Sequence, residues 1–299
     1  MRTLRRIFGP QPSAWLFLLP GLALFTIFLV IPLLYSARIS FYDWNIIDPS
    51  RSTFLGFGNY ARAIADPIFR RAVVNTIVYA LVTVPLQLVL ALLAAVLLNV
   101  RVPGRTFFRV ATYLPVITSW VIVTLVFEYL FNSQAGLVNY VLVDVLHLVA
   151  SPVRWLADPI LAMVPLHLLG IWKGVGWSAI ILLAALQSVP RNIYEAAEVD
   201  GVGPAQTFRY ITLPLLRPTL VFLLVVLVIG ALNVYISGLL LTNGGNPMGL
   251  THFVLTLMYQ KTFTNLEFGY GSSISYMLAA FIFVISVVQI RLLRRRTEY

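Results

Sequence analysis

Long apolar stretches alternate with shorter polar ones along the 299-residue chain. An α-helix needs roughly 20 predominantly apolar residues to cross the ~30 Å hydrocarbon layer of a membrane. Stretches near this length predict six spans, at about 13–35, 73–98, 110–131, 159–187, 219–241 and 272–290. Because backbone groups in lipid must be hydrogen bonded within the protein, we expect an all-α, polytopic transmembrane helical bundle that forms one membrane domain over residues 1–299.

Three other segments need a separate interpretation. Residues 137–150 are apolar but too short to cross, so they predict an interfacial or re-entrant helix. Residues 59–68 predict a short helix that lies on the membrane. The first apolar stretch follows a basic start, as in a cleaved signal peptide, but it is too long and no small-x-small site follows it. We therefore expect an uncleaved first span.

The composition agrees with an integral membrane protein. Hydrophobic residues make up 60% of the chain and charged residues only 11%, against about 25% charged residues in a soluble domain. The absence of cysteine excludes disulfides, thiol chemistry and iron–sulfur sites. The three histidines lie far apart in the sequence, so no metal site is expected, and no P-loop glycine pattern is present. Energy for any transport must therefore come from another chain or from a gradient.

Arginine and lysine gather in alternate connecting segments. The N-terminus, residues 99–109, the central loop at 188–218 and the C-terminus hold three, three, three and four arginines, whereas the opposite segments hold seven Lys and Arg spread over longer loops. The positive-inside rule then places both termini and the central loop in the cytoplasm of a multi-pass protein of the cell (inner or plasma) membrane. Topology and lipid headgroups account for the net charge of +10, and no nucleic-acid partner is expected.

The central loop at 188–218 is the long polar interruption between two apolar halves. Asn192, with Glu195 three residues later, predicts a capped helix over residues 192–199. The acidic and basic residues of the loop balance, whereas a loop held only by lipid charge would be basic. The pattern therefore indicates a segment that is recognised by another protein.

Glycine and proline divide this loop further. Gly201 suits the left-handed turn that often ends a helix, and Pro204 suits the first turn of a second short helix. Ile193, Ala196 and Ala197 are predicted to share one face of the first helix, where the small alanines would let another backbone come close.

The spacing within the loop resembles a known motif. Glu195-Ala196-Ala197, three residues, Gly201, nine residues and Ile211-Thr212-Leu213-Pro214 resemble the EAA loop in the membrane subunits of bacterial ABC importers. Elsewhere, residues 20–25, Asn75-Thr76, Leu114-Pro115 and residues 243–247 are similar to the first permease subunit of carbohydrate-uptake systems, so that the resemblance covers about residues 15–292. Val202 departs from the pattern, since the family often has alanine there.

The resemblance implies a fold of the type I importer class and a coupling role for the central loop. Glu195, Ala196, Ala197, Asp200 and Gly201 would dock into a groove of an ATPase subunit. The support for that helix would come from Ile211, Leu213 and Pro214.

The resemblance also implies the partners and the chemistry. The chain would be a non-catalytic permease subunit that moves a sugar or related polyol by alternating access. Its partners would be a second homologous permease subunit in a heterodimer, two ATP-binding subunits, an extracytoplasmic solute-binding protein and the lipid bilayer. ATP and Mg would be held by the ATPase subunits, and this chain would bind no cofactor.

Polar side chains within the predicted spans are candidates for the substrate pathway. A lysine inside a span is unfavourable by about 2.5–3.5 kcal/mol, so Lys173 is either a site residue, a snorkelling side chain or a partner of another subunit. Asn233 and Ser237, predicted to lie one turn apart on the fifth span, either line the pathway or join helices to one another.

Two other classes of protein remain as alternatives. A self-sufficient secondary transporter of a small polar solute would show a repeat between its halves and acidic residues at mid-span, and neither is seen. A membrane enzyme would need nucleophile, base or metal ligands gathered at one depth, and none gather in the sequence. No motif in the chain identifies which sugar would be carried.

Overall fold

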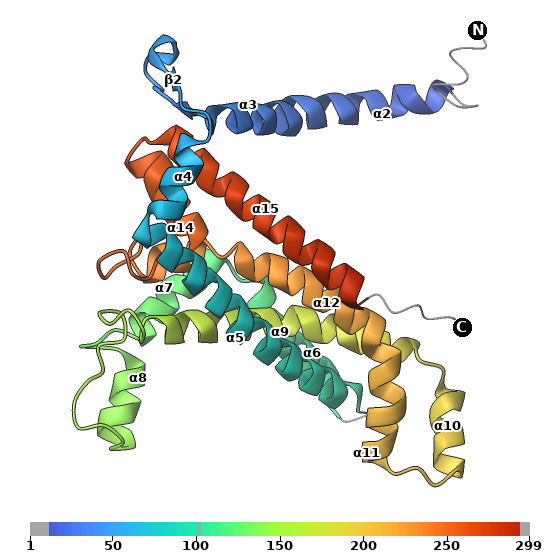
Figure 1. Cartoon of the computed structure of the whole chain (residues 1–299). Coiled ribbons are helices and arrows are strands. Elements are labelled where there is room, and N and C mark those ends of the chain that lie inside the picture. The colour runs from blue at the N-terminus through green and yellow to red at the C-terminus, as the bar shows by residue number, and fades with distance from the viewer. Residues whose placement is uncertain (1–11, 101–102, 294–299) are drawn as a thin grey trace. The chain divides into compact units, whose positions relative to one another are not determined.

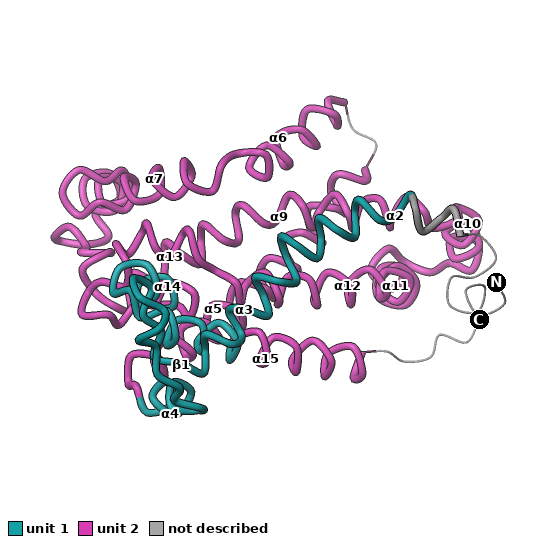
Figure 2. Tube along the Cα trace, turned by 90° about the horizontal axis from the view of Figure 1, so that it is seen from above, with its two compact units in different colours: residues 1–65, 258–277 teal, residues 66–257, 278–299 magenta. Residues whose placement is uncertain are grey.

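The computed structural model describes residues 12–100 and 103–293 (Figure 1). The chain divides into two compact units, residues 1–65 with 258–277 and residues 66–257 with 278–299 (Figure 2). Several arginines used to infer the orientation lie outside the described residues: Arg2, Arg5, Arg6, Arg101, Arg294, Arg295 and Arg296.

The first unit begins with one long apolar helical stretch. It comprises α2 (Pro12–Phe25), the π-helical turn η1 (Thr26–Val30) and α3 (Ile31–Ile39). Its apolar side chains are largely exposed, as expected for a helix whose surroundings are lipid.

A short hairpin and a helix follow α3 in the same unit. The hairpin pairs β1 (Tyr42–Asp43) with β2 (Thr53–Phe54) in antiparallel register, and η2 (Pro49–Arg51) lies between them. The buried amide of Asn59, at the start of α4 (Gly58–Ala65), donates to the carbonyl of Tyr42 at 2.9 Å, which anchors the hairpin to that helix. The segment expected at 59–68 is therefore α4, ending at Ala65, and a separate helix begins at Pro67.

The second unit holds most of the helices. They are α5 (Pro67–Asn99), α6 (Arg105–Ile117), α7 (Trp120–Leu130), α8 (Leu137–Tyr140), η3 (Val141–Val145), α9 (Met163–Ser188), α10 (Arg191–Val199), α11 (Pro204–Thr207), η4 (Phe208–Thr212), α12 (Leu213–Leu232) and α13 (Ile236–Leu241). The elements α14 (Val254–Tyr259), η5 (Gln260–Thr264) and α15 (Phe268–Leu293) complete the chain, and the boundary between the units crosses α14 and α15.

Five helical stretches of the described residues are long and apolar enough to cross a membrane, and the bent pair α6–α7 makes a sixth if it is counted as one span. The five are Phe17–Ile39, Pro67–Asn99, Met163–Ser188, Pro204–Leu241 and Phe268–Leu293. The apolar segment at 137–150 forms only the short α8 and η3, and His147 just beyond them has a φ of 50° that ends the helix.

Two of the expected spans are interrupted. The third is broken between α6 and α7, whose axes differ by 94°, because Thr118 and Ser119 have extended backbones with ψ of 149° and 136°. The fifth is broken after α12, where residues 233–235 leave the helix before α13 begins. Broken helices at membrane depth are tolerated where they line a cavity or are covered by protein.

The helix α9 packs against α5, α6 and α12. Glycines on α9 permit this close approach, because a methyl group at Gly170 or Gly174 would overlap side chains of α5. A methyl group at Gly176 would instead overlap the backbone oxygen of Thr112 on α6. Small residues at such interfaces let helix backbones approach each other in membranes.

Gly176→Ala is expected to destabilise the protein by about 1–3 kcal/mol. The added methyl group would overlap the Thr112 backbone oxygen, and α6 and α9 would have to move apart to remove the overlap. Thermal unfolding of the purified protein in detergent measures this effect. Gly230→Ala on α12 is the matched control, since nothing lies within 4 Å of the added methyl group there. The control is expected to be neutral or stabilising, and equal melting of the two variants would contradict the close packing of α6 on α9.

Polar side chains of α5 form hydrogen bonds to the loop after α13 and to α9. The amide of Asn75 donates to the carbonyls of Leu250 and His252, at 2.8 and 2.9 Å. Farther along α5, the amide of Gln87 donates to the hydroxyl of Ser178 on α9 at 3.0 Å. These buried hydrogen bonds fix the loop after α13 and the position of α9 relative to α5.

Candidate functional site

The central loop at 188–218 forms two short helices, α10 and α11. The first residue of α10 is Arg191, and its N-cap is Pro190, with no side-chain hydrogen bond at the cap. The prediction that Asn192 caps this helix with Glu195 is therefore wrong. Glu195 instead pairs with Arg191 one turn away, at 2.9 Å, an exposed ion pair of the kind that contributes only about 0.3–0.5 kcal/mol.

The end of α10 has the left-handed turn that was predicted at Gly201. Gly201 adopts a φ of +74°, and nothing lies within 4 Å of the position of a β-carbon there. The next amide, of Val202, donates to the carbonyl of Ala197 at 2.9 Å and closes the last helical turn. Pro204 then occupies the first turn of α11, as predicted.

The faces of α10 differ from the prediction. Ala197 is buried with 4% of its surface exposed, whereas Ala196 is exposed, so the two alanines do not share a face. The buried face also carries Tyr194, whose hydroxyl hydrogen bonds to that of Thr212 in η4 at 3.3 Å. Ala197 therefore packs on its own chain.

The outer face of α10 is small and partly apolar. Glu195, Ala196 and Val199 recur at helical spacing on it, and all three are exposed. Val199 is 87% exposed, although it ends a helix whose other outward residues are polar or small. A single exposed apolar side chain is common on protein surfaces, so Val199 is a docking candidate because it lies between Ala197 and Gly201 of the EAA-like loop.

The predicted support residues lie where η4 joins α12. Ile211 and Leu213 are half-buried, and Pro214 is exposed in the first turn of α12. They give a continuous helical path from the loop into the fifth span. Asp200 is exposed and forms the C-cap of α10, directly before Gly201.

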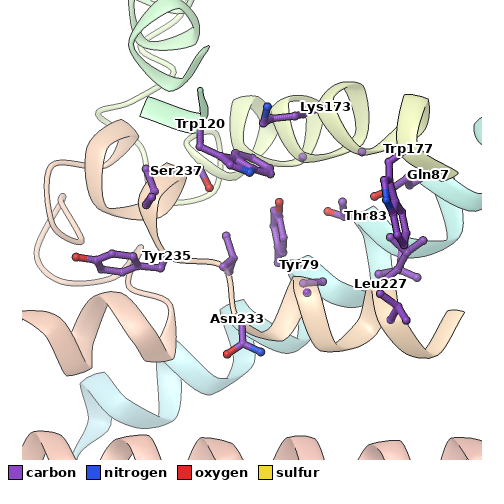
Figure 3. A pocket seen from close by; sticks show the side chains of 18 of the residues that line it. Tyr79, Thr83, Gln87, Trp120, Lys173, Trp177, Leu227, Asn233, Tyr235 and Ser237 are labelled. Carbon is purple, nitrogen blue, oxygen red and sulfur yellow. The ribbon is translucent and has the colours of Figure 1, made fainter. Parts of the chain in front are cut away.

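A cavity of about 470 Å³ lies among α5, α9, α12 and α13 (Figure 3). Its walls hold the aromatic rings of Tyr79, Trp120, Trp177 and Tyr235. Its polar groups include Thr83, Gln87, Asn233 and Ser237, all of them uncharged. Clefts of roughly 300–1,000 Å³ with apolar walls and a few polar groups are typical of small-molecule sites.

Lys173 also borders the cavity, but its ammonium group is bound to protein. It is 4% exposed, and its Nζ donates to the carbonyls of Pro115 and Thr118 at 2.8 and 2.6 Å. The same nitrogen lies 5.0 Å from the centre of the Trp120 ring. Neither snorkelling nor pairing with another subunit is needed to explain this lysine.

Asn233 and Ser237 both line the cavity, but on different segments. Asn233 is the C-cap of α12, and its amide donates to the carbonyl of Ile229 at 2.8 Å. Ser237 is buried on α13. The prediction that they lie one turn apart on a continuous helix is therefore wrong, because the break at residues 233–235 separates them.

Residues 55–298 match the sequence profile of a family described as the binding-protein-dependent transport system inner membrane component. The chain belongs to this family. As such a component, the permease is a non-catalytic membrane subunit of a transport system that depends on a binding protein.

Individual relatives agree with the family. The permease is 33% identical to the lactose transport system permease protein LacF of Rhizobium radiobacter over 287 residues, which cover 95% of each chain. It is 32% identical to the trehalose/maltose transport system permease protein MalF of Thermococcus litoralis, over 95% of this chain and 94% of that protein. The resemblance to permeases of carbohydrate-uptake ABC importers is confirmed.

A solved structure shares the fold. It is that of a bacterial alginate ABC transporter in complex with an alginate pentasaccharide-bound periplasmic protein. The alignment has a TM-score of 0.85 at 24% sequence identity and covers 99% of the permease and 98% of that chain. The expected all-α, polytopic fold class is confirmed.

The structure adds residues that the sequence did not point to. Val199 is one of the three unspecified positions between Ala197 and Gly201 of the motif, and only its exposure distinguishes it from a core residue. Tyr79, Trp120 and Trp177 lie on separate helices of the chain, so no spacing rule brings them together. Among the described residues, no group of His, Asp and Glu is placed to hold a metal ion.

Proposed function

We propose that this permease imports a sugar or a related polyol as part of an ATP-driven ABC importer. The observation that carries the proposal is the lining of the cavity, which combines four aromatic rings and four uncharged hydrogen-bonding side chains with aliphatic ones. The apolar faces of a sugar ring stack on aromatic side chains, while its hydroxyls need donors and acceptors. The relatives named for lactose and for trehalose/maltose support the same class of substrate.

We infer that the energy comes from two ATP-binding subunits, which would hold ATP and Mg and dock on α10. Glu195, Ala196, Val199 and Asp200 offer an exposed surface for this contact. Ala197 and Gly201 set the orientation of the helix from within the loop, and Ile211, Leu213 and Pro214 connect it to α12. A second homologous permease subunit would complete the membrane domain as a heterodimer.

The same proposal places both termini and the α10–α11 loop in the cytoplasm. The described residues that support this orientation through the positive-inside rule are Arg105, Arg109, Arg191, Arg209, Arg217 and Arg291. The binding protein would then deliver its sugar from the opposite side of the membrane.

The mechanism would be alternating access to the cavity. ATP binding would bring the ATPase subunits together, and α10 would move as a rigid body with the start of α12. Shifting a two-state equilibrium from one extreme to the other requires about 5.5 kcal/mol of differential binding. A helix closed by the Val202–Ala197 hydrogen bond and tied to η4 through Tyr194 suits that transmission better than a loose linker.

The proposal predicts that the purified chain alone does not hydrolyse ATP, because its sequence contains no P-loop pattern. Proteoliposomes with the ATPase subunits, the second permease and the binding protein should hydrolyse ATP and accumulate a radiolabelled disaccharide, tested with lactose, maltose and trehalose. Vanadate-sensitive hydrolysis by the chain alone would contradict the assignment. Gradient-driven uptake by the chain alone, without ATP, would favour the alternative of a self-sufficient secondary transporter.

A further inference from the structure

The break between α6 and α7 leaves backbone oxygens that the helices cannot satisfy. The last four carbonyls of any α-helix have no partner within it, and α6 ends at Ile117. Thr118 and Ser119 are extended, so the following helix does not take up these bonds. Backbone groups inside a membrane span are costly to leave without a hydrogen bond, so a helix end within a broken span needs partners from the protein or from a water-filled cavity.

Lys173 on α9 supplies a partner for one of these carbonyls and for the next carbonyl at the bend. Its ammonium group donates to the carbonyl of Pro115 in the last turn of α6 and to that of Thr118 at the bend. The hydroxyl of Thr118 donates to the same Pro115 oxygen at 2.6 Å. A cation at this point also faces the negative end of the α6 dipole.

The bend in turn determines where Trp120 lies. Trp120 is the first residue of α7, two residues after Thr118. Its indole borders the cavity, as does the ring of Tyr79 (Figure 3). The ammonium group contacts one side of the Trp120 ring, at 5.0 Å from its centre, a distance at which cation–π attraction holds an indole in place.

We propose that Lys173 is a positioning residue of the cavity: it holds the end of α6 and thereby fixes the Trp120 indole as part of the cavity wall. The inference that this wall serves a sugar rests on the proposed function. Lys173 is then not a ligand for an anionic substrate, because its hydrogen bonds are directed to the Pro115 and Thr118 oxygens. The other polar groups of the cavity are uncharged, which selects neutral sugars over acidic ones.

Tryptophan fluorescence of the assembled complex tests the positioning role without knowledge of the substrate. Lys173→Met removes the donors, and Lys173→Arg keeps a charged donor that can reach the same carbonyls. The methionine variant is expected to shift the emission to longer wavelength and to increase quenching by acrylamide, and the arginine variant should show a smaller change. The chain contains six tryptophans, so the change must be assigned to one of them.

Two background variants make that assignment. In Trp120→Phe the effect of Lys173→Met should disappear, whereas in Trp177→Phe, which alters another ring of the same cavity, it should persist. An effect that persists in Trp120→Phe would show general loosening of the fold and overturn the proposal. Unchanged emission in every background would overturn it as well.

Protection of Trp120 from acrylamide by a bound sugar tests the positioning role of Lys173 separately from the proposed sugar substrate. A neutral disaccharide from the panel lactose, maltose and trehalose should protect Trp120 from acrylamide in the wild type, and Lys173→Met should abolish the protection. An alginate oligosaccharide should not protect. If no disaccharide protects the wild type while Lys173→Met still alters Trp120 alone, the positioning role stands and the sugar assignment fails. Protection by the acidic oligosaccharide that depends on Lys173 would overturn the inference.

Discussion

Val199→Lys is expected to abolish sugar uptake while the permease reaches the membrane at a near-normal level. Val199 is the large apolar side chain most exposed on α10, at 87%, and a lysine left buried and unpaired in an interface costs about 2–5 kcal/mol. A loss of about 2 kcal/mol weakens binding of the ATPase subunit roughly 30-fold. Co-purification of the ATPase subunit and uptake by whole cells measure the two effects.

The choice of lysine keeps the helix itself intact. Val199 ends α10, and a cation at the C-terminus of a helix is favourable by about 0.3–1 kcal/mol. Failure to bind the ATPase subunit therefore cannot be attributed to fraying of α10. Val199→Leu keeps an apolar side chain there and should retain most of the uptake. Full ATPase content and normal uptake in Val199→Lys would show that this face of α10 is not the docking surface.

A bulky residue at Ala197 tests something different. Because Ala197 is buried against its own chain, a tryptophan there would first displace α10 from the rest of the loop. Loss of transport in such a variant would not distinguish a blocked groove from a distorted loop. The exposed face with Ala196 and Val199 is therefore the better place to test docking.

The sequence predicted those features of the loop that depend on neighbouring residues. The helix predicted at 192–199, which the structure has at Arg191–Val199, and the turn at Gly201 follow from local backbone preferences. The spacing of the motif added the family. The cap predicted at Asn192 was wrong: Pro190, with φ of −59° and ψ of 133°, is the N-cap, so Asn192 lies inside the first turn of the helix.

Features that depend on distant residues could not be predicted in this way. The oxygens that bind Lys173 lie 58 and 55 residues away in the sequence, so the lysine could be recognised as unusual but not explained. The direction of Ala197 depends on how α10 rests on the remainder of the loop, which periodicity alone does not give. The aromatic rings of the cavity likewise gather only because α9 packs against α5 and α6.

Gly201→Val is expected to reduce uptake about tenfold while leaving the spans inserted. The φ of +74° at Gly201 is the left-handed conformation, which residues with a β-carbon adopt at a cost of roughly 1–2 kcal/mol. A penalty of about 1.4 kcal/mol lowers the population of the native turn tenfold. The chain can relieve the strain by changing the angle between α10 and α11, which would turn the docking face away from the ATPase subunit. Uptake and ATPase co-purification, each normalised to permease in the membrane, measure the effect.

The surroundings of Gly201 make this a test of backbone conformation alone. Nothing lies within 4 Å of a β-carbon at Gly201 or at Gly203, so the space around the two positions is alike at the first side-chain atom and the backbone conformation is what differs. Gly203 has an ordinary extended backbone with φ of −67°, and Gly203→Val should retain most of the uptake. Gly201→Asn should fall between the two, because asparagine tolerates the left-handed region better than other residues with a side chain. Equal activity of Gly201→Val and Gly203→Val would mean that the left-handed turn does not direct α10, and that the coupling proposed here does not depend on its angle.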